Sequence, residues 1–279
     1  MHHVLLVAIA VAQSFIVDTS SLPPQTPYRT EGVRFSDVDL DGDWDAFLSK
    51  AGEGDPALDL LWINQGGLQG GTIGEFTNES AVRLPPVLAP TMSHAIGDID
   101  ADGDLDVHVS VSGDLFGLWG NRWWVNSGSN QGADPGFFVD ETSVRWVGLG
   151  GPGSSVAPSQ VSSYGSFYDD CLDSDFADFD NDGDLDLFHS TYKGSQPSRI
   201  FLNDGSGFFA EFNPPGYQGI AGQIAVGAPA VWCEGTYQPW TTDSTGSFAD
   251  IATQAADVEV GDLDGDFDID VLVGDNGWR

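Results

Sequence analysis

Aspartates at alternate positions recur in four nine-residue segments of the sequence. The segments read DVDLDGDWD at 37–45, DIDADGDLD at 98–106, DFDNDGDLD at 178–186 and DLDGDFDID at 262–270. Together they hold twenty of the 43 acidic residues, so much of the formal net charge of −34 is concentrated in four places. Carboxylates this close repel one another and destabilise a compact chain unless a cation neutralises them.

The spacing favours calcium as that cation, because Ca²⁺ accepts several oxygen ligands at flexible geometry. Carboxylates at the first, third, fifth and ninth positions, together with the carbonyl of the seventh residue, can converge on one centre. Glycine stands at the sixth position of the first three segments, where a left-handed backbone would favour it. The sequence therefore predicts three to four Ca²⁺ sites. The candidate metal-binding residues are Asp37, Asp39, Asp41, Asp43, Asp45, Asp98, Asp100, Asp102, Asp104, Asp106, Asp178, Asp180, Asp182, Asp184, Asp186, Asp262, Asp264, Asp266, Asp268 and Asp270.

Other cation sites fit the segments less well. An EF-hand needs a glutamate at the twelfth position, and these segments have Leu48, Val109, His189 and Val273 there. Magnesium keeps several of its waters and avoids sites made only of protein ligands. A metal-free acidic turn remains the alternative. The fourth segment has Phe267 in place of the glycine, so its occupancy stays open.

Short strand-like runs surround each acidic segment. GVRFS, HAIG, DSDFA and VEVG come before, and AFLS, VHVS, LFHS and VLVG come after. Behind the first three segments follow a run that ends in Asn before a Gly-rich turn (LLWINQGG, RWWVNSGS, RIFLNDGSG) and a Phe-led strand (EFTNES, FFVDETS, FFAEF). Such runs are typical of strands, and no window shows convincing helical periodicity with caps. Each unit is predicted to have four strands, with the acidic loop between the first and the second.

Repeated four-stranded units are typical of β-propeller blades. The predicted fold class is all-β: a β-propeller, or an open propeller fragment, of four-stranded blades with DxDxDGxxD loops. Insertions at 148–165 and 213–246 lengthen the spacing between loops, and the last blade is expected to be incomplete because Arg279 follows the fourth loop so soon.

The acidic loop, the Asn-ending strand with its Gly-rich turn and the Phe-led strand together resemble FG-GAP/VCBS repeats. These are the calcium-loop blades of integrin-α-like β-propellers, which are also common in secreted bacterial proteins. The resemblance covers residues 15–279, with interruptions at the two insertions. It implies calcium ligands at the first, third, fifth, seventh and ninth positions of each loop.

The ends and the bulk composition suggest an exported protein. Residues 1–12, MHHVLLVAIAVA, resemble a signal peptide, which would leave the repeats at 13–279 in a secreted or cell-surface protein. No later stretch of 18 apolar residues predicts a transmembrane span, and the negative charge argues against nucleic acid as a partner. Cys171 and Cys233 are either unrelated thiols or, in an oxidising compartment, one disulfide.

Few side chains suggest a catalytic or ligand site. No nucleophile–base arrangement or catalytic motif is present, and His108 and His189 are expected to be structural residues on opposite strand faces. Trp123 and Trp124 should also point to opposite faces of their strand. Either both rings pack between blades, or one of them is exposed beside the acidic rim. The candidate ligand-binding residues, able to stack on a sugar ring, are Trp123, Trp124 and Trp240.

The predicted function is a non-enzymatic, secreted, calcium-binding scaffold for adhesion or for binding an extracellular protein or carbohydrate ligand. One alternative is a polysaccharide-active enzyme or accessory module, such as a lyase-type propeller, in which calcium bridges substrate carboxylates. The chain has only 9 Lys and Arg residues, which counts against that alternative. Another is that the acidity adapts the protein to high salt and that cation binding is incidental.

Overall fold

The computed structural model describes residues 19–24, 29–52, 55–112, 120–147, 171–190, 199–211, 255–267 and 269–275. These residues form four β-sheets in which all strand pairs but one are antiparallel. The first sheet has the strand order β1-β2-β4-β5, with β3 paired to β2. Its strands are β1 (Thr30–Ser36), β2 (Asp45–Gly52), β3 (Asp55–Pro56), β4 (Leu60–Asn64) and β5 (Phe76–Asn78).

The second and third sheets repeat this arrangement. The second sheet has the order β6-β7-β8-β9, formed by β6 (Thr91–Gly97), β7 (Asp106–Val111), β8 (Arg122–Asn126) and β9 (Phe138–Asp140). The third has the order β11-β12-β13-β14 with β10 beyond β14, formed by β10 (Trp146–Val147), β11 (Ser174–Ala177), β12 (Asp186–His189), β13 (Arg199–Asn203) and β14 (Phe209–Glu211). β10 pairs with β14 in parallel, so the chain leaving the second sheet adds a strand to the third.

The fourth sheet is a two-stranded hairpin of β15 (Ala255–Gly261) and β16 (Asp270–Asp275). In all four sheets the acidic segment joins the first strand to the second, as the sequence predicts. The Asn-ending runs become β4, β8 and β13, and the Phe-led runs become β5, β9 and β14. An all-β fold of repeated sheets is therefore confirmed.

Helical structure in the described residues is limited to single turns. α1 (Ser80–Arg83) and α2 (Thr142–Arg145) follow β5 and β9, while the 3₁₀ turns η1 (Gly67–Gln69) and η2 (Ser129–Gln131) follow β4 and β8. The sequence gives no periodic signal for elements this short. No helix in the part of the chain that the structure describes is long and apolar enough to cross a membrane.

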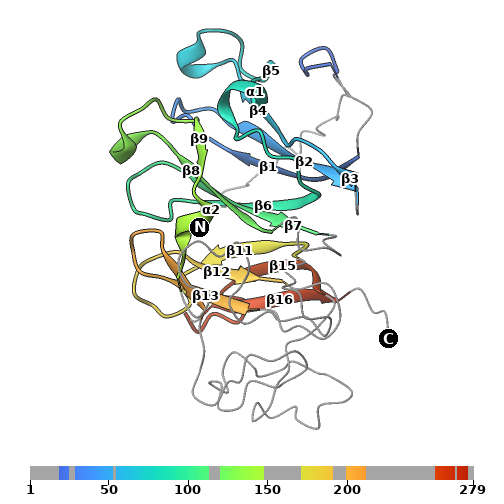
Figure 1. Ribbon diagram of the computed structural model, residues 1–279. Coiled ribbons are helices and arrows are strands. Elements are labelled where there is room, and N and C mark those ends of the chain that lie inside the picture. Colours follow the sequence, from blue (N-terminus) through green and yellow to red (C-terminus); the bar gives the residue numbers. More distant parts are fainter. Residues whose placement is uncertain are drawn as a thin grey trace, which may run out of the picture.

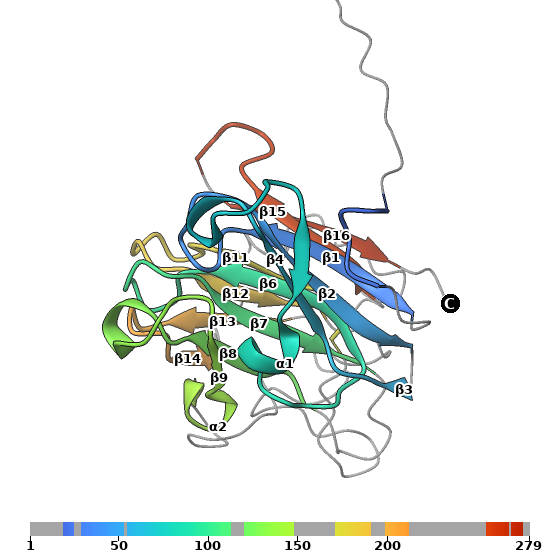
Figure 2. The same cartoon turned by 90° about the horizontal axis from the view of Figure 1, so that it is seen from above.

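The sheets are stacked in chain order, from the first at the top of Figure 1 to the third and fourth at the bottom. β6 packs against β1, β11 against β6, and β15 against β11, so the first strands of the sheets are neighbours (Figure 2). Arg34 of β1 reaches past the second sheet, because its Nη2 pairs with Asp173 Oδ1 at 3.3 Å. The other oxygen of Asp173 accepts the Val258 amide of β15 at 3.1 Å. One carboxylate thus joins the first, third and fourth sheets.

Apolar side chains fill the layers between sheets. Phe47, Leu61 and Ile63 of the first sheet pack with Val107, Val109, Trp124 and Phe138 of the second. Trp123 packs on the other side, with Trp146, Leu187, Phe201 and Phe209, and Phe188 and Ile200 of the third sheet pack with Val258 of the fourth. Burying apolar area is the main stabilising contribution in such layers.

Of the two expectations for Trp123 and Trp124, packing of both rings is confirmed and exposure of one ring is wrong. Their side chains point to opposite faces of β8 as expected, but the exposed fractions are 0% and 1%. The expectation of an exposed ring failed because a sheet in the middle of a stack has both faces covered. Neither ring can stack on a sugar, and Trp240 lies outside the described residues.

Candidate metal centres

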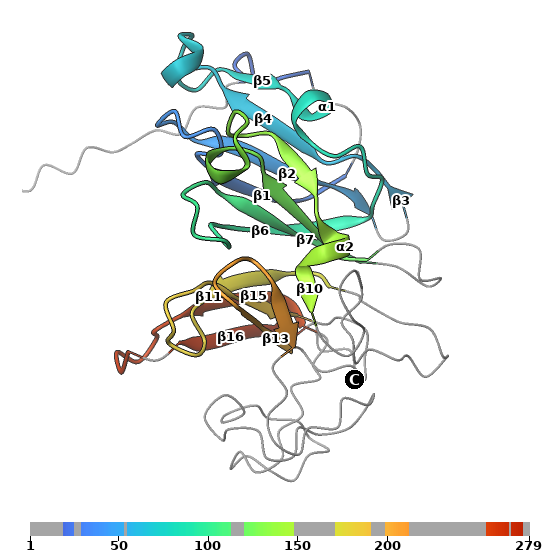
Figure 3. The same cartoon turned by 60° about the vertical axis from the view of Figure 1, so that its left-hand side comes forward.

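The four acidic hairpins lie on the same side of the stacked sheets, on the left in Figure 3. Each is the connection between the first two strands of its sheet, so the antiparallel pairing of those strands fixes where it begins and ends. The closing pairs are Ser36–Asp45, Gly97–Asp106, Ala177–Asp186 and Gly261–Asp270.

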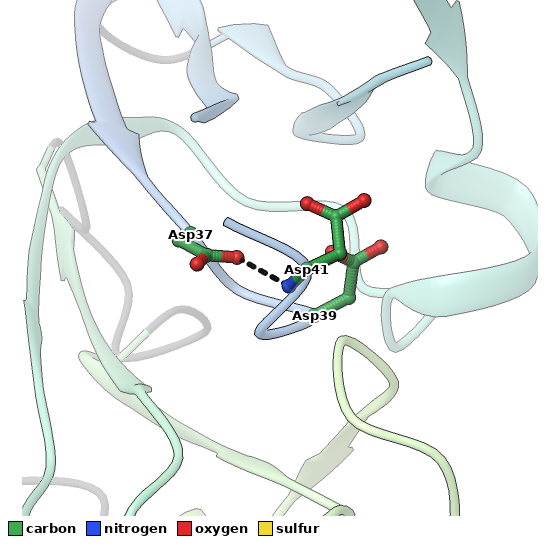
Figure 4. A group of neighbouring side chains, drawn as sticks. All are labelled: Asp37, Asp39 and Asp41. Carbon is green, nitrogen blue, oxygen red and sulfur yellow. Dashed lines mark hydrogen bonds between the residues drawn. The ribbon is translucent and has the colours of Figure 1, made fainter. Parts of the chain in front are cut away.

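The first aspartate of each hairpin folds the turn around its own carboxylate. Asp37 Oδ1 accepts the Asp41 amide at 3.0 Å (Figure 4). Its Oδ2 accepts the Gly42 amide, also at 3.0 Å. Asp98, Asp178 and Asp262 make the same two bonds with the fifth and sixth residues of their hairpins, at 3.0–3.1 Å. The first carboxylate is thereby held at the centre of the turn.

The aspartate at the ninth position connects the hairpin to the rest of its sheet by hydrogen bonds. Asp106 Oδ2 accepts the amide of Ile99 at 3.3 Å, and its Oδ1 accepts the amide of Asn126 on β8 at 2.8 Å. Asp45 and Asp186 make the matching bonds in the first and third sheets. Asp270 accepts the Leu263 amide at 2.8 Å. The ninth position is therefore structural even before a cation is considered.

Two positions of every hairpin have a left-handed backbone. The sixth has φ of 95° at Gly42, 96° at Gly103 and 99° at Gly183, which confirms the prediction for glycine there. Phe267 adopts φ 75° at the same position of the fourth hairpin. The fourth position is also left-handed, at Leu40, Ala101 and Asn181 and at Gly265 of the last hairpin. The sequence analysis missed this second position, because three different side chains occupy it.

Carboxylate oxygens come together in each hairpin at distances that could hold a metal ion. Three oxygens, one from each of three aspartates, lie within 4.8 Å of one another in every hairpin. The groups are Asp37, Asp39 and Asp41; Asp98, Asp100 and Asp106; Asp178, Asp180 and Asp186; and Asp262, Asp264 and Asp270. Thus the first and third positions meet in all four copies, joined by the fifth position in one copy and by the ninth in three.

The fifth and seventh positions differ from the expectation in detail. Asp41 Oδ1 accepts the Asp43 amide at 3.1 Å, and Asp102 and Asp182 do the same for Asp104 and Asp184. The seventh residue is expected to offer its carbonyl, yet the side chains of Asp43 and Asp104 are buried as well. Asp266 of the fourth hairpin is exposed, and Asp268 lies outside the described residues.

Several of these oxygens are buried without a hydrogen bond in the described part of the chain. They include Oδ1 of Asp39, Oδ1 of Asp100 and both oxygens of Asp104. A buried acceptor without a donor is costly, and oxygen atoms are the ligands that hard divalent cations prefer. The donor set therefore fits a cation such as Ca²⁺.

Burial and crowding disfavour the ionised form of several carboxyl groups in these hairpins. Burial, reinforced by neighbouring aspartates, raises the pKa of Asp39 to about 6, that of Asp45 to about 7 and that of Asp106 to about 8. Burial also raises the pKa of Asp186, in the third hairpin, to about 6. A bound cation favours the ionised carboxylate and would reverse these shifts.

In the first two hairpins, one glutamine and one arginine contact the aspartate at the third position. Asp39 Oδ2 accepts Gln69 Nε2 at 2.7 Å and pairs with Arg83 Nη2 at 3.5 Å. Asp100 Oδ2 has the same two kinds of partner, Gln131 Nε2 at 3.3 Å and Arg145 Nη2 at 3.5 Å. In each case one carboxylate oxygen is held and the other, Oδ1, is left for a cation. Sequence analysis missed these four residues, although the matching segments ESAVR and ETSVR contain two of the chain's nine basic residues.

A buried asparagine links neighbouring hairpins. Asn126 Nδ2 donates to the carbonyl of Leu105 in its own hairpin at 3.2 Å and to that of Val38 in the preceding hairpin at 2.9 Å. Asn203 does the same with Leu185 at 3.1 Å and Ile99 at 2.7 Å. The acidic hairpins of neighbouring sheets are thus joined by hydrogen bonds.

The described histidines and the described cysteine are buried. His108 and His189 come from opposite faces of equivalent strands, and their ring centroids lie 6.3 Å apart because the two sheets face each other. His108 Nδ1 bonds with Ser174 Oγ at 2.8 Å, and burial lowers its pKa well below the usual value. Cys171 is a buried thiol. Its pairing with Cys233 stays a prediction, because Cys233 lies outside the described residues.

No protein-family model matches the chain, and no curated protein matches it. The similarity to FG-GAP/VCBS repeats therefore rests on the residues of the repeats alone.

Proposed function

We propose that the protein is a calcium-binding β-propeller, or an open arc of propeller blades, of the FG-GAP/VCBS type. It acts as a non-enzymatic scaffold outside the cell, where it supports adhesion or the binding of a protein or carbohydrate ligand. The observation that carries the proposal is that three carboxylates, always including the first and third positions, converge in the same hairpin of four consecutive sheets.

Calcium has a structural role in this proposal. In each hairpin the aspartates at the first and ninth positions accept backbone amides and so hold the turn. The aspartate at the third position brings a further oxygen to the same centre. A Ca²⁺ ion would neutralise part of the negative charge of these carboxylates. It would stabilise the connection between the first and second strands of each sheet.

Thermal unfolding with and without calcium tests the proposal. Extracellular calcium modules bind with dissociation constants of about 10⁻⁴–10⁻³ M, and one site at a 100-fold excess over its constant contributes about 2.7 kcal/mol. We expect Tm to rise by at least about 5 °C on adding saturating calcium after EDTA. Isothermal titration should give three to four bound ions per chain, counted by hairpin.

Magnesium at equal ionic strength is the control, since it separates specific binding from charge screening. A Tm that is indifferent to calcium and to EDTA would contradict the proposal. An equal response to both cations, or to KCl at matching ionic strength, would favour general screening of the acidic surface instead.

A further inference from the structure

We infer that Arg83 and Arg145 couple cation binding in one hairpin to the docking of the next sheet. The inference rests on the proposed function, because it concerns the same metal sites. It identifies the two arginines as positioning residues for those sites. The side chains are 10% and 7% exposed, and both belong to the single helical turn that follows the fourth strand of their sheet.

Each guanidinium joins the metal hairpin of its own sheet to a turn of the following sheet. Arg83 pairs with Asp39 of the first hairpin, and its Nη1 donates to the Pro135 carbonyl of the second sheet at 3.4 Å. The ring of Phe137 in the same turn lies 4.7 Å from the guanidinium carbon. Asp39 and this turn are therefore held by one planar cation.

Arg145 repeats the arrangement one sheet further along. It pairs with Asp100 of the second hairpin, and Nη1 donates to the carbonyls of Ser206 and Gly207 in the third sheet at 2.9 and 3.3 Å. The Phe208 ring lies 5.2 Å from its guanidinium carbon. Because the same contact recurs at equivalent positions of two repeats, it is a regular feature of the repeat.

The turns that accept the arginine hydrogen bonds, 133–138 and 206–208, each have a glycine beside the guanidinium. Gly136 and Gly207 have φ of 83° and 75°, and a Cβ on either would collide with the arginine Nη1. The Gly136 amide also donates to Asn126 Oδ1 at 2.8 Å, so this turn is tied to the end of β8. A change at Arg83 should therefore reach hairpin 37–45 on one side of the boundary and turn 133–138 on the other.

The arginines act by positioning and not by adding charge. Arg83 Nε donates to Glu79 Oε2 at 2.6 Å and Arg145 Nε to Glu141 Oε2 at 2.8 Å, so each cation is paired within its own helical turn. Each guanidinium holds Oδ2 of the aspartate at the third position of its hairpin. This contact leaves Oδ1 of the same carboxylate for the cation. Removing such an outer partner of a metal ligand typically weakens metal affinity by about 10- to 100-fold.

Hydrogen exchange on the full chain, measured across a calcium titration, tests the coupling. In the unaltered protein calcium should slow exchange of hairpin 37–45 and, by about fivefold or more, of turn 133–138 in the next sheet. Arg83→Met should shift the half-point at 37–45 to about tenfold higher calcium. It should also reduce the slowing at 133–138 to less than about twofold. Hairpin 98–106 and turn 206–208 should respond as in the unaltered protein.

Two further variants make the test specific. Arg145→Met should transfer the defect to hairpin 98–106 and turn 206–208. Arg29→Met is the matched control, because it removes the same charge from a side chain that is 70% exposed and pairs only with Glu31 among the described residues. It should change neither the half-points nor the slowing.

The outcomes separate this inference from the proposed function. Unchanged calcium slowing at 133–138 in Arg83→Met would overturn the coupling while leaving calcium binding intact. An unaltered protein that binds no calcium by titration would overturn both. If Arg83→Met does not fold, Phe137→Leu removes only the aromatic contact on the receiving turn, and reciprocity requires it to raise the half-point at 37–45. An unchanged half-point there would overturn the coupling equally.

Discussion

At the scale of single residues, the acidic hairpins depend as much on backbone conformation as on charge. The sixth residue is left-handed in all four copies, and only the fourth copy lacks glycine there. Phe267 is 88% exposed, so its ring gains little from burial to offset the strain. A left-handed backbone costs about 1–2 kcal/mol for a residue that carries a Cβ.

Phe267→Gly should therefore stabilise the protein. We expect a gain of about 0.5–1 kcal/mol in the free energy of unfolding, because relief of the strain is partly offset by the greater chain entropy of glycine. Urea unfolding in EDTA measures this without a contribution from calcium. A loss of stability would mean that the phenylalanine ring makes a contact worth more than the strain.

Gly183→Ala is the reciprocal control in the third hairpin. A Cβ at this glycine meets no atom within 4 Å, so any loss comes from the backbone alone. The expected loss is about 0.5–1 kcal/mol.

The sequence predicts the positions of the hairpin aspartates and glycines, but it does not predict which distant residues contact them. Alternating aspartates locate the hairpins, and glycine at the sixth position marks the turn, because both properties are local. Arg83 and Arg145 gave no such signal, since each acts on an aspartate far along the chain and on a turn of another sheet. The expected exposure of Trp123 or Trp124 failed for the same reason. Alternation along a strand says where a side chain points and not what covers it.

At the scale of elements, β8 and β13 connect the acidic hairpin of their own sheet to that of the preceding sheet. Each strand ends in a buried asparagine that uses its amide for several backbone groups. Asn126 and Asn203 reach the carbonyl of the preceding hairpin, whereas Asn64 donates to Trp44 in its own hairpin. The boundary between sheets is thus held by a polar contact as well as by apolar packing.

Alanine at these asparagines should separate the two kinds of bond. All three variants lose the bond to their own hairpin, but only Asn126→Ala and Asn203→Ala also leave a carbonyl of the preceding sheet without its donor. We expect these two to lose about 1 kcal/mol more stability than Asn64→Ala, measured by chemical denaturation. Equal losses in all three would show that the bond across the boundary contributes nothing.

At the scale of the whole molecule, charge balance determines how stability varies with pH. Burial raises the carboxyl pKa of Asp39, Asp45 and Asp106 to about 6, 7 and 8. The metal-free folded state therefore binds more protons than the unfolded chain. The stability that these groups provide is fully present below about pH 4 and is lost as pH rises through their folded pKa values.

Calcium should remove this dependence, because it stabilises the ionised carboxylates. We expect Tm in EDTA to fall between about pH 5 and pH 8, and the rise in Tm on adding calcium to grow over the same range. Scanning calorimetry in matched buffers measures both quantities. A calcium effect of the same size at every pH would show that the buried carboxylates are already ionised without metal.

The parallel strand β10 gives the boundary between the second and third sheets a consequence for biosynthesis. β10 precedes every other strand of the sheet that it joins, and its partner β14 is the last of them to be made. During translation β10 therefore leaves the ribosome early and waits unpaired until β14 follows. The third sheet cannot be completed strand by strand in the order of its chain. We therefore expect the third sheet to be completed only after its last strand, β14, has been made, whereas the second sheet needs no strand from beyond β9.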